Sequence, residues 1–249
     1  MALPSAESPS GLIETRALVK AFGLLPALRQ LDLTIERGQF VALLGPNGSG
    51  KSTLLRLLSG LSKPTSGTIT IGGWSLPDEA AAVRAQIGMV SHKVLLYENL
   101  SAQENLAFFA RLYNLPDADL EARIAGLLQQ VGLARRAHDL VRTFSRGMQQ
   151  RLSIARALLH NPDILLLDEP HTGLDQDASA ILDDLLRQAH AGGRTIIMST
   201  HELGRAAALA GRVIILSRGV IGHDAPTTGL DGLRLAALYT EVTSMASAR

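Results

Sequence analysis

Residues 45–52 carry the most specific chemical pattern in this sequence. They read GPNGSGKS and fit the phosphate-binding pattern G-x-x-x-x-G-K-[ST] in full. Glycines let the backbone approach a phosphate chain and direct N–H groups toward it. The ammonium group of Lys51 can reach the β- and γ-phosphates, and the hydroxyl of Ser52 is a ligand for Mg²⁺. The pattern therefore predicts a nucleoside triphosphate site with its magnesium ion. The predicted phosphate-binding residues are Gly45, Pro46, Asn47, Gly48, Ser49, Gly50, Lys51, Ser52 and Thr53.

Two adjacent carboxylates, Asp168 and Glu169, follow a run of aliphatic residues at 164–167. Such a run is typical of a strand that is buried on both faces of a parallel sheet. Reactive groups in open parallel sheets gather at the carboxyl ends of the strands, so we expect this pair to lie beside the 45–52 loop. Asp168 would then hold Mg²⁺ through water, and Glu169 would be the general base that polarises the attacking water. The alternative is an acidic pair with only a solvated role at a strand end.

The segments that must position these residues predict an α/β fold with a mostly parallel core sheet and antiparallel strands near the N-terminus. An apolar strand at 41–44 leads into the phosphate loop, and leucines at helical spacing over 54–61 predict a half-buried helix after it. Strands and helices alternate after residue 163, as crossover helices between parallel strands do. The expected strands are 12–22, 31–35, 41–44, 67–71, 87–90, 164–167, 195–198 and 213–216, with a hairpin near 218–219. The expected helices are 54–61, 78–86, 101–113, 117 or 119 to about 132, 178–191, 202–209 and 230–245.

One long interval carries helical patterns and no strand pattern. Its first helix begins with a capping-box pattern, in which Ser101 is followed by Glu104. We interpret the interval as a helical subdomain that is inserted between the strand-bearing halves of the chain. The predicted organisation is a flexible tail at 1–11 and a single domain at 12–249, with a core at 12–91 and 161–249 and a helical subdomain at about 92–160.

Composition and charge exclude several classes of protein. The formal net charge is +1, so no strong field favours nucleic acid or anionic lipid as the main partner. The chain has no cysteine, which removes disulfides, thiolate nucleophiles and cysteine metal sites. No apolar stretch approaches the ~20 residues that span a bilayer, and the N-terminus lacks the features of a signal peptide. We therefore expect a cytoplasmic protein without a nucleic-acid partner, which another polypeptide would hold at any membrane.

Three further motifs follow the phosphate loop in a fixed order. Residues 144–151 read FSRGMQQR, residues 172–175 read TGLD, and residues 199–201 read STH. Together with the phosphate loop and the carboxylate pair, they resemble the motifs of the ATP-binding-cassette (ABC) ATPases. The first resembles the family's signature motif, whose commonest form is LSGGQ, the second resembles the D-loop, and the third resembles the switch histidine. The resemblance covers residues 12 to about 242 and is specific because five motifs occur in order.

The resemblance implies a head-to-tail dimer in which two ATP molecules are sandwiched. Each ATP would lie between the phosphate loop of one subunit and the signature motif of the other. Ser145 and Gly147 begin a predicted helix, and its free N–H groups suit a γ-phosphate held across the interface. The resemblance also implies that Asp175 of the D-loop belongs to the nucleotide site and that His201 contacts the γ-phosphate and the Glu169 region. A purely structural histidine is the alternative for His201.

Two further positions acquire a role from the resemblance. Phe22 occupies the place of the aromatic residue that stacks on adenine, and its alternative role is a core phenylalanine. His92 stands where the family has its Q-loop glutamine, and its charge varies near neutral pH. The alternative for His92 is a solvated loop histidine. The signature also departs from its commonest form, with Arg146 for a glycine and Met148 for the glutamine, yet S-x-G-M variants are familiar in the family and we expect activity.

By resemblance, the chain is expected to be the ATPase subunit of an ABC transporter. It would bind ATP with Mg²⁺, form a homodimer or heterodimer, hydrolyse the β–γ bond and transmit closure to separately encoded membrane-spanning permease subunits. Those permeases would hold it at the inner face of the cell membrane. The helical insert and the Q-loop region would receive the permease. The aromatic residues there, each either part of that contact or part of the core, are Tyr97, Phe108, Phe109 and Tyr113.

Within the family, residues 90–113 and 144–151 are similar to the haem-exporter ATPases of cytochrome c maturation, although Lys93 stands where those have glutamine. Other exporters with separate ATPase and membrane subunits, such as drug or polysaccharide exporters, are one alternative. A soluble ABC ATPase, such as one in iron–sulfur cluster assembly, is another. A phosphate-loop kinase or GTPase does not fit, because it has no use for the signature motif or the carboxylate pair.

Overall fold

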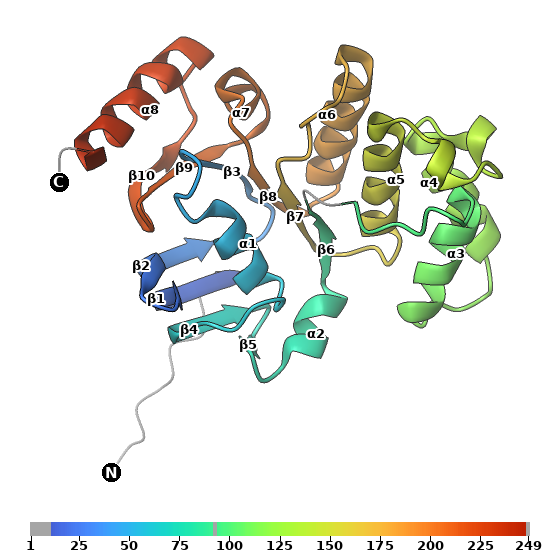
Figure 1. Ribbon diagram of the computed structural model, residues 1–249, viewed down its shortest axis with the longest axis horizontal. Coiled ribbons are helices and arrows are strands. Elements are labelled where there is room, and N and C mark those ends of the chain that lie inside the picture. Colours follow the sequence, from blue (N-terminus) through green and yellow to red (C-terminus); the bar gives the residue numbers. More distant parts are fainter. Residues whose placement is uncertain (1–10, 92–93, 248–249) are drawn as a thin grey trace.

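A computed structural model describes residues 11–91 and 94–247 of the chain, and its strands form two sheets (Figure 1). The strands are β1 Ile13–Phe22, β2 Leu25–Ile35, β3 Phe40–Leu44, β4 Ser66–Ile71, β5 Trp74–Leu76, β6 Ile87–Val90, β7 Ile164–Asp168, β8 Thr195–Ser199, β9 Arg212–Ser217 and β10 Val220–Pro226. The four-stranded sheet has the order β2-β1-β4-β5 and is antiparallel. The six-stranded sheet has the order β10-β9-β3-β8-β7-β6.

The six-stranded sheet is the core of the fold. Its strands run parallel from β9 to β6, and β10 pairs antiparallel with β9 at one edge. Every residue of β3, β7 and β8 is buried, as expected for strands that are covered on both faces. The parallel core sheet and the antiparallel N-terminal sheet confirm the predicted fold class.

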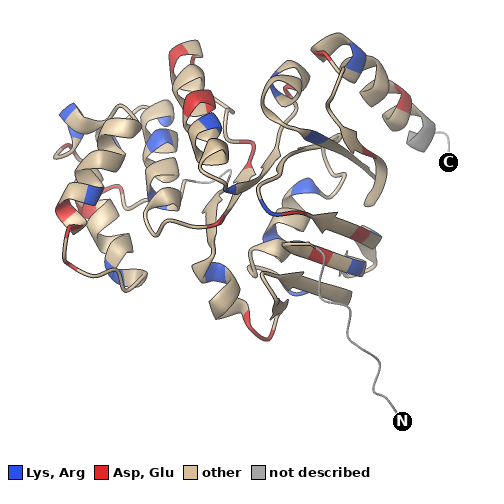
Figure 2. Ribbon diagram, turned by 180° about the vertical axis from the view of Figure 1, so that it is seen from behind, with Lys and Arg blue, Asp and Glu red and all other residues tan. Residues whose placement is uncertain are grey.

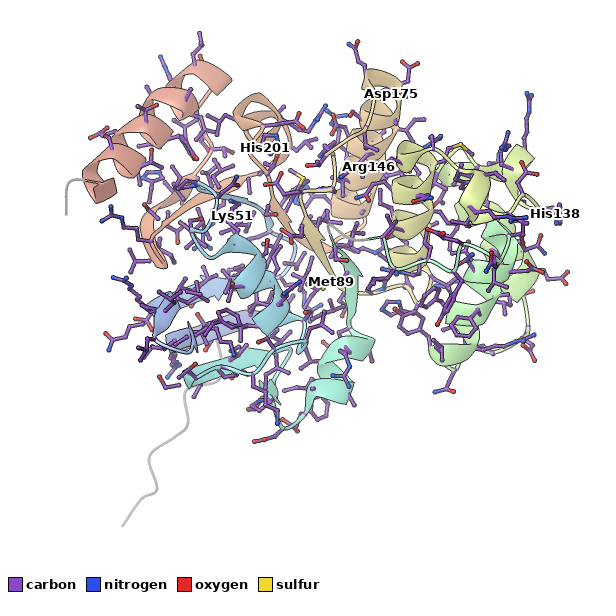
Figure 3. All side chains as sticks on the ribbon, in the orientation of Figure 1. Lys51, Met89, His138, Arg146, Asp175 and His201 are labelled. Carbon is purple, nitrogen blue, oxygen red and sulfur yellow. The ribbon has the colours of Figure 1, made fainter. Side chains whose placement is uncertain are left out.

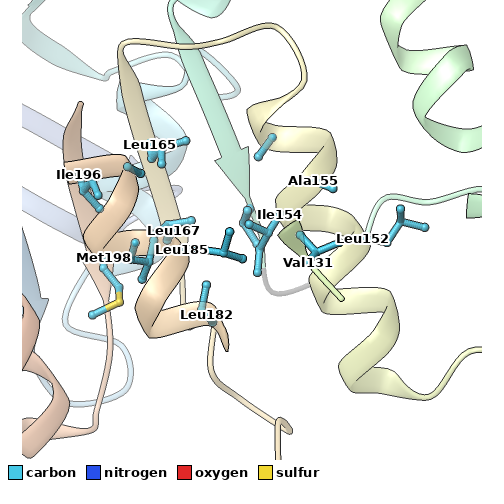
Figure 4. Packing of buried hydrophobic residues seen from close by; sticks show 14 of the residues in the cluster. Val131, Leu152, Ile154, Ala155, Leu165, Leu167, Leu182, Leu185, Ile196 and Met198 are labelled. Carbon is cyan, nitrogen blue, oxygen red and sulfur yellow. The ribbon is translucent and has the colours of Figure 1, made fainter. Parts of the chain in front are cut away.

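Helices cover the core sheet on both faces. They are α1 Lys51–Leu58, α2 Ala80–Ala85, α3 Ala102–Leu112, α4 Leu120–Gln130, α5 Arg146–Leu158, α6 Gln176–Ala191, α7 Leu203–Leu209 and α8 Gly232–Ser247. Alternate strand residues enter two hydrophobic clusters, because successive side chains of a strand point to opposite faces. Val41 and Leu43 belong to the cluster that contains α1 and the antiparallel sheet. Leu165 and Met198 belong to the other cluster, where Figure 4 shows the sheet packed against α6 and α5.

Between β6 and β7, the described residues form α3, α4, α5 and two short 3-10 turns, as the helical pattern predicted. The capping box at the start of α3 is present. The hydroxyl of Ser101 accepts a hydrogen bond from the backbone N–H of Glu104 (3.2 Å), and the Glu104 carboxylate accepts one from the backbone N–H of Ser101 (2.7 Å). One hydrophobic cluster joins these helices to the sheet, so the division into a core and a helical subdomain stays a prediction.

Two features of the described chain differ from, or add to, the expected elements. β2 begins at Leu25, six residues before the expected start at Leu31, and its early residues are largely exposed. β5 has three residues, of which two are exposed, and it is held by its pairing with β4. Backbone pairing with a neighbouring strand holds both segments in place. The sequence did not predict them, because neither segment has an apolar pattern. Charged side chains are spread over the fold. Lysine, arginine and acidic residues lie on both sheets and on most helices (Figure 2). Among the described residues, no helix is long and apolar enough to cross a membrane.

Candidate active site

The phosphate loop connects the carboxyl end of β3 to the first turn of α1, as the sequence predicted. All three of its glycines have positive φ angles, which other residues rarely adopt, and at two of them neighbouring backbone also leaves no room for a side chain. At Gly45, with φ +145°, an added Cβ would lie 2.2 Å from the carbonyl oxygen of Leu216. At Gly50, with φ +108°, it would lie 2.8 Å from the carbonyl oxygen of Ala27. Neighbouring backbone therefore fills the space beside the loop, and glycine is required at both positions.

Lys51 places a buried ammonium group inside this loop. The residue is 7% exposed, and its Nζ donates hydrogen bonds to the carbonyl oxygens of Gly45 (2.7 Å) and Pro46 (3.1 Å). Burial lowers the pKa of Lys51, while the carboxylates of Glu169 and Asp168 act in the opposite direction. The two carboxylates thus lie close enough to Lys51 to favour its charged form.

The end of β7 holds Asp168 in a small polar cluster. Its Oδ1 accepts hydrogen bonds from the hydroxyl of Ser52 (3.0 Å) and from the hydroxyl of Ser199 (2.7 Å). Asp168 is opposite Ser199 in the parallel pairing of β7 with β8, which brings the two side chains together. Sequence reasoning assigned Ser199 no role, because strand order cannot be read from the sequence. The available sequence signal was that Ser199 is a polar residue at the end of a largely apolar strand.

Glu169 lies just beyond the strand, in a left-handed backbone conformation with φ +53°. Such a conformation costs a non-glycine residue about 1–3 kcal/mol and is concentrated at functional sites. The backbone N–H of Glu169 donates to the Ser199 hydroxyl (3.0 Å), which supports this turn. The turned carboxylate has its Oε2 2.6 Å from Nδ1 of His201. The structure therefore brings together the predicted base and the predicted switch histidine.

A pocket of about 750 Å³ lies over the phosphate loop. The described residues that line it are Phe22, Ala27, Asn47, Gly48, Ser49, Gly50, Lys51, Ser52, Thr53, Glu169, Thr172 and His201. Phe22 is 56% exposed and has the Nζ of Lys20 5.0 Å from its ring centre, so it is not a core phenylalanine. Another hollow, of about 460 Å³ beside α4 and α6, is lined by none of the predicted site residues.

These residues fit a nucleoside triphosphate with Mg²⁺. Lys51 offers a cation to the phosphates, and the hydroxyl of Ser49 is buried without a hydrogen-bond partner among the described residues. Ser52 and Asp168 provide adjacent oxygen atoms of the kind that Mg²⁺ prefers. Within residues 11–91 and 94–247, no group of three or more His, Cys, Asp or Glu residues could hold a metal ion. Mg²⁺ is usually bound by one or two carboxylates together with substrate phosphates and water, an arrangement that Ser52 and Asp168 would allow.

The predicted signature residues Ser145 and Gly147 lie outside the phosphate-loop pocket, at the start of α5. Ser145 caps the N-terminus of α5, and its hydroxyl accepts a hydrogen bond from the backbone N–H of Met148 (3.3 Å). A Cβ at Gly147 would lie 3.6 Å from the side chain of Leu174, so the start of α5 packs against the D-loop segment. None of the residues at the start of α5 is among the residues that line the phosphate-loop pocket.

The D-loop begins the next helix beside the signature. The carboxylate of Asp175 caps α6 by accepting a hydrogen bond from the backbone N–H of Ala178 (2.8 Å). A Cβ at Gly173 would lie 2.9 Å from Nε of Arg146, which shows that the arginine side chain lies across this loop. Figure 3 shows Arg146 and Asp175 displaced from Lys51 and His201 toward the helical side of the molecule. His92, the predicted Q-loop residue, lies outside the described residues.

A glycine-rich loop between β3 and α1, with a buried lysine and with a carboxylate pair at the end of β7, two strands away in the same parallel sheet, defines a nucleotide-binding protein of the phosphate-loop class. The chain belongs to the ABC transporter family, whose sequence model matches residues 28–172, more than half of the chain.

Two curated relatives and one solved structure illustrate the similarity. The chain is 40% identical over 200 residues to Nod factor export ATP-binding protein I of Cupriavidus pinatubonensis, with 80% of this chain and 62% of that protein covered. It is 36% identical over 190 residues to linearmycin resistance ATP-binding protein LnrL of Bacillus subtilis, with 76% and 61% covered. The matched region thus spans less than two thirds of either relative.

The solved structure is the dimeric post-hydrolysis state of the ATP-binding cassette MJ0796 bound to ADP and Pi. It superposes with a TM-score of 0.80 at 30% identity, over 86% of this chain and 98% of that one.

Proposed function

We propose that this chain is the ATP-binding and ATP-hydrolysing subunit of an ABC exporter and that it works as a dimer. The observation that supports this most strongly is the separation of two half-sites in one chain. Lys51, Glu169 and His201 line one pocket, whereas Ser145 and Gly147 do not line it. A second copy, turned head to tail, would supply the missing half, and the dimeric state of the related cassette supports that arrangement.

In the proposed reaction, the phosphate loop binds and orients the triphosphate. Lys51 would exchange its hydrogen bonds to the loop carbonyls for contacts with the β- and γ-phosphates. Ser52 and Asp168 would hold Mg²⁺, which neutralises charge on the phosphates when it is bound. Phe22, at the rim of the same pocket, would stack on the adenine.

Glu169 would supply the base. Its carboxylate would accept a hydrogen bond from the attacking water and polarise it. His201, whose side chain is 68% exposed, keeps that carboxylate oriented through the 2.6 Å contact. In the dimer, Ser145 and the free N–H groups at the start of α5 would face the γ-phosphate bound to the other copy, with Asp175 beside them. His92 is proposed as the Q-loop residue on the resemblance alone.

A groove of about 560 Å³ is the proposed contact surface for a membrane-spanning permease. Phe109, Tyr113 and Leu112 of the α3 region line one side, and Arg84 and Arg156 add positive charge. Leu112, Leu61 and Leu95 all line this groove and are all exposed, and exposed apolar side chains that lie together, unlike single ones, mark interaction sites. The full lining is Ser59, Leu61, Ala81, Arg84, Ala85, Ile87, Met89, Ser91, Leu95, Phe109, Leu112, Tyr113, Asn114 and Arg156. Through this surface the permease would hold the chain at the inner face of the cell membrane.

The direction of transport is proposed from the relatives, whose names refer to Nod factor export and to linearmycin resistance. Haem, the substrate suggested by the similarity to cytochrome c maturation ATPases, appears in neither name. Haem export therefore remains one specific proposal for the substrate, and export of another compound, such as a drug, is the alternative. A role in iron–sulfur cluster assembly is the competing function outside transport.

Co-purification tests the exporter role. The tagged chain, expressed with its neighbouring reading frames, should retain a multi-span membrane protein and hydrolyse ATP. Leu112→Arg should abolish that retention while leaving ATP hydrolysis by the isolated chain unchanged. Leu233→Arg, at an exposed leucine of α8 outside the groove, is the matched control and should retain the partner. Recovery of a soluble scaffold protein instead of a membrane protein would contradict the transport role.

A further inference from the structure

Four side chains from three elements form a continuous polar chain behind the catalytic pair. Nε2 of His171, in the turn after β7, lies 2.8 Å from Oδ1 of Asp183 on α6. Nε of Arg205 on α7 donates to the other carboxylate oxygen of Asp183 at 3.2 Å. A second nitrogen of Arg205 donates to the carboxylate of Glu202, the residue before α7. The turn after β7, the middle of α6 and the start of α7 are thus tied together.

The two ends of this chain flank the two residues proposed to act on the γ-phosphate. His171 follows Glu169 by two residues, and Glu202 follows His201 directly. Because Glu169 and His201 are themselves in contact at 2.6 Å, the backbone and the polar contacts form a closed ring. The contact between His171 and Asp183 is therefore one of the links that hold one member of the pair relative to the other, in addition to their own contact and the pairing of β7 with β8.

The turn on the His171 side is held by its own backbone. The N–H of Thr172 donates to the carbonyl of Glu169 (3.2 Å), and the N–H of Leu174 donates to the carbonyl of His171 (3.1 Å). A displacement of the His171 ring would therefore move the backbone that carries the Glu169 carboxylate. On the other side, the N–H of Glu202 donates to the hydroxyl of the buried Thr200 (3.0 Å), which fixes the residue after His201.

His171 is buried, and its surroundings favour the neutral form of its imidazole. The residue is 4% exposed, and burial lowers the pKa of its imidazole, with Arg205 acting in the same direction. The neutral ring donates from Nε2 to Asp183, and its Nδ1 is buried without a hydrogen-bond partner in the described part of the chain. Loss of this donor would leave a largely buried Asp183 oxygen without one of its partners, which is more costly than loss of an exposed pair.

On the basis of the proposed function, we propose that His171 is a positioning residue for ATP hydrolysis. Through its Nε2–H···Asp183 hydrogen bond, and through Arg205 beyond it, His171 holds the turn that carries Glu169 in register with the segment that carries His201. This role is separate from nucleotide binding, because His171 is not among the residues that line the phosphate-loop pocket.

Steady-state ATPase kinetics of the full chain test the proposal with two substitutions at one position. His171→Phe fills the site without a donor and should lower kcat about tenfold or more, with KM for ATP unchanged within about twofold, the loss expected for a contact used mainly in the transition state. His171→Gln places an amide N–H near the position of Nε2 and should recover most of kcat. Arg205→Met cuts the same connection from α7 and should lower kcat in the same way even if His171→Phe fails to fold.

The matched control is the neighbouring acidic residue on α6. Asp184 pairs with Arg187 on the exposed face of the helix, so Asp184→Ala removes an α6 ion pair that does not reach the turn. It should leave kcat unchanged. Equal kcat in wild type, folded His171→Phe and Arg205→Met would overturn the proposal, as would equal losses in His171→Phe and His171→Gln. Absence of any hydrolysis by wild type would instead remove the proposed function on which this inference rests.

Discussion

Nδ1 of His201 lies 2.6 Å from Oε2 of Glu169, across two neighbouring parallel strands of the core sheet. Glu169 reaches this contact from a left-handed backbone conformation, with φ +53°, that few glutamates adopt. The strain and the short contact together place the carboxylate beside Lys51 and over the phosphate loop. A carboxylate held in this way can polarise a water molecule that attacks a bound triphosphate.

Glu169→Gln is predicted to reduce ATP turnover by roughly 10²–10⁴-fold, the usual contribution of a positioned acid or base, while ATP remains bound. The amide keeps the shape of the side chain but cannot act as a base. Steady-state hydrolysis and equilibrium ATP binding check this together. Glu121→Gln, an acidic residue in the first turn of α4, is the control and should have wild-type turnover. Normal turnover by Glu169→Gln would show that the base has been assigned to the wrong residue.

Lys51→Ala should weaken ATP binding by roughly 10- to 100-fold, since a hydrogen bond to a charged group contributes about 1.5–3 kcal/mol. The substitution removes the ammonium group whose Nζ lies 2.7 Å from the carbonyl oxygen of Gly45. Calorimetric titration with ATP measures the change. Lys63→Ala, at an exposed lysine outside the pocket, should bind ATP as wild type does. Unchanged affinity in Lys51→Ala would count against the phosphate-loop site.

Phe22→Ala should also weaken ATP binding, by roughly 5- to 100-fold if a base stacks on this ring with the ~1–3 kcal/mol found for stacking on aromatic side chains. Phe22→Tyr preserves the ring face and should bind ATP normally. Comparison of ATP with inorganic triphosphate separates the base from the phosphates. The affinity for triphosphate should be the same in all three proteins, and an equal loss for both ligands would refute stacking.

The stability of the fold should decrease in mild acid. Burial lowers the pKa of His160 from its ordinary 6.5, Arg123 acts in the same direction, and the hydrogen bond to the carbonyl of Ile87 opposes them. Burial also lowers the pKa of His171. A histidine with a lowered pKa binds more protons in the unfolded state than in the folded state. Its contribution to stability is therefore fully present above about pH 6.5, the pKa in the unfolded chain, and is lost as the pH falls from there toward the lower pKa of the folded state.

Urea denaturation at about pH 7.5 and about pH 5.5 measures this effect. The free energy of unfolding of wild type should fall on acidification, and that of His160→Gln should fall less, because glutamine does not titrate. A larger or equal loss in His160→Gln would show that His160 does not contribute in the predicted direction.

The sequence allowed the phosphate loop, the carboxylate pair and the core strands to be predicted, because each depends on a local pattern. The buried run at 164–167 and its two carboxylates are found where expected, at the end of β7 beside the loop. Ser199 could not be assigned, because its contact with Asp168 depends on β7 and β8 being neighbours. The ring formed by His171, Asp183 and Arg205 joins residues 34 positions apart and has no sequence signal of its own.

The most direct test of the composite site is a disulfide between copies. The chain has no natural cysteine, so a mixture of Asn47→Cys and Arg146→Cys proteins, both in the Glu169→Gln background, can form a mixed disulfide only between the phosphate loop of one copy and the signature of another. We predict that this mixed disulfide forms with ATP and Mg²⁺ under oxidising conditions, and that it does not form with ADP or without nucleotide. A mixture that binds ATP yet forms no such disulfide, or forms it equally without nucleotide, would contradict the account.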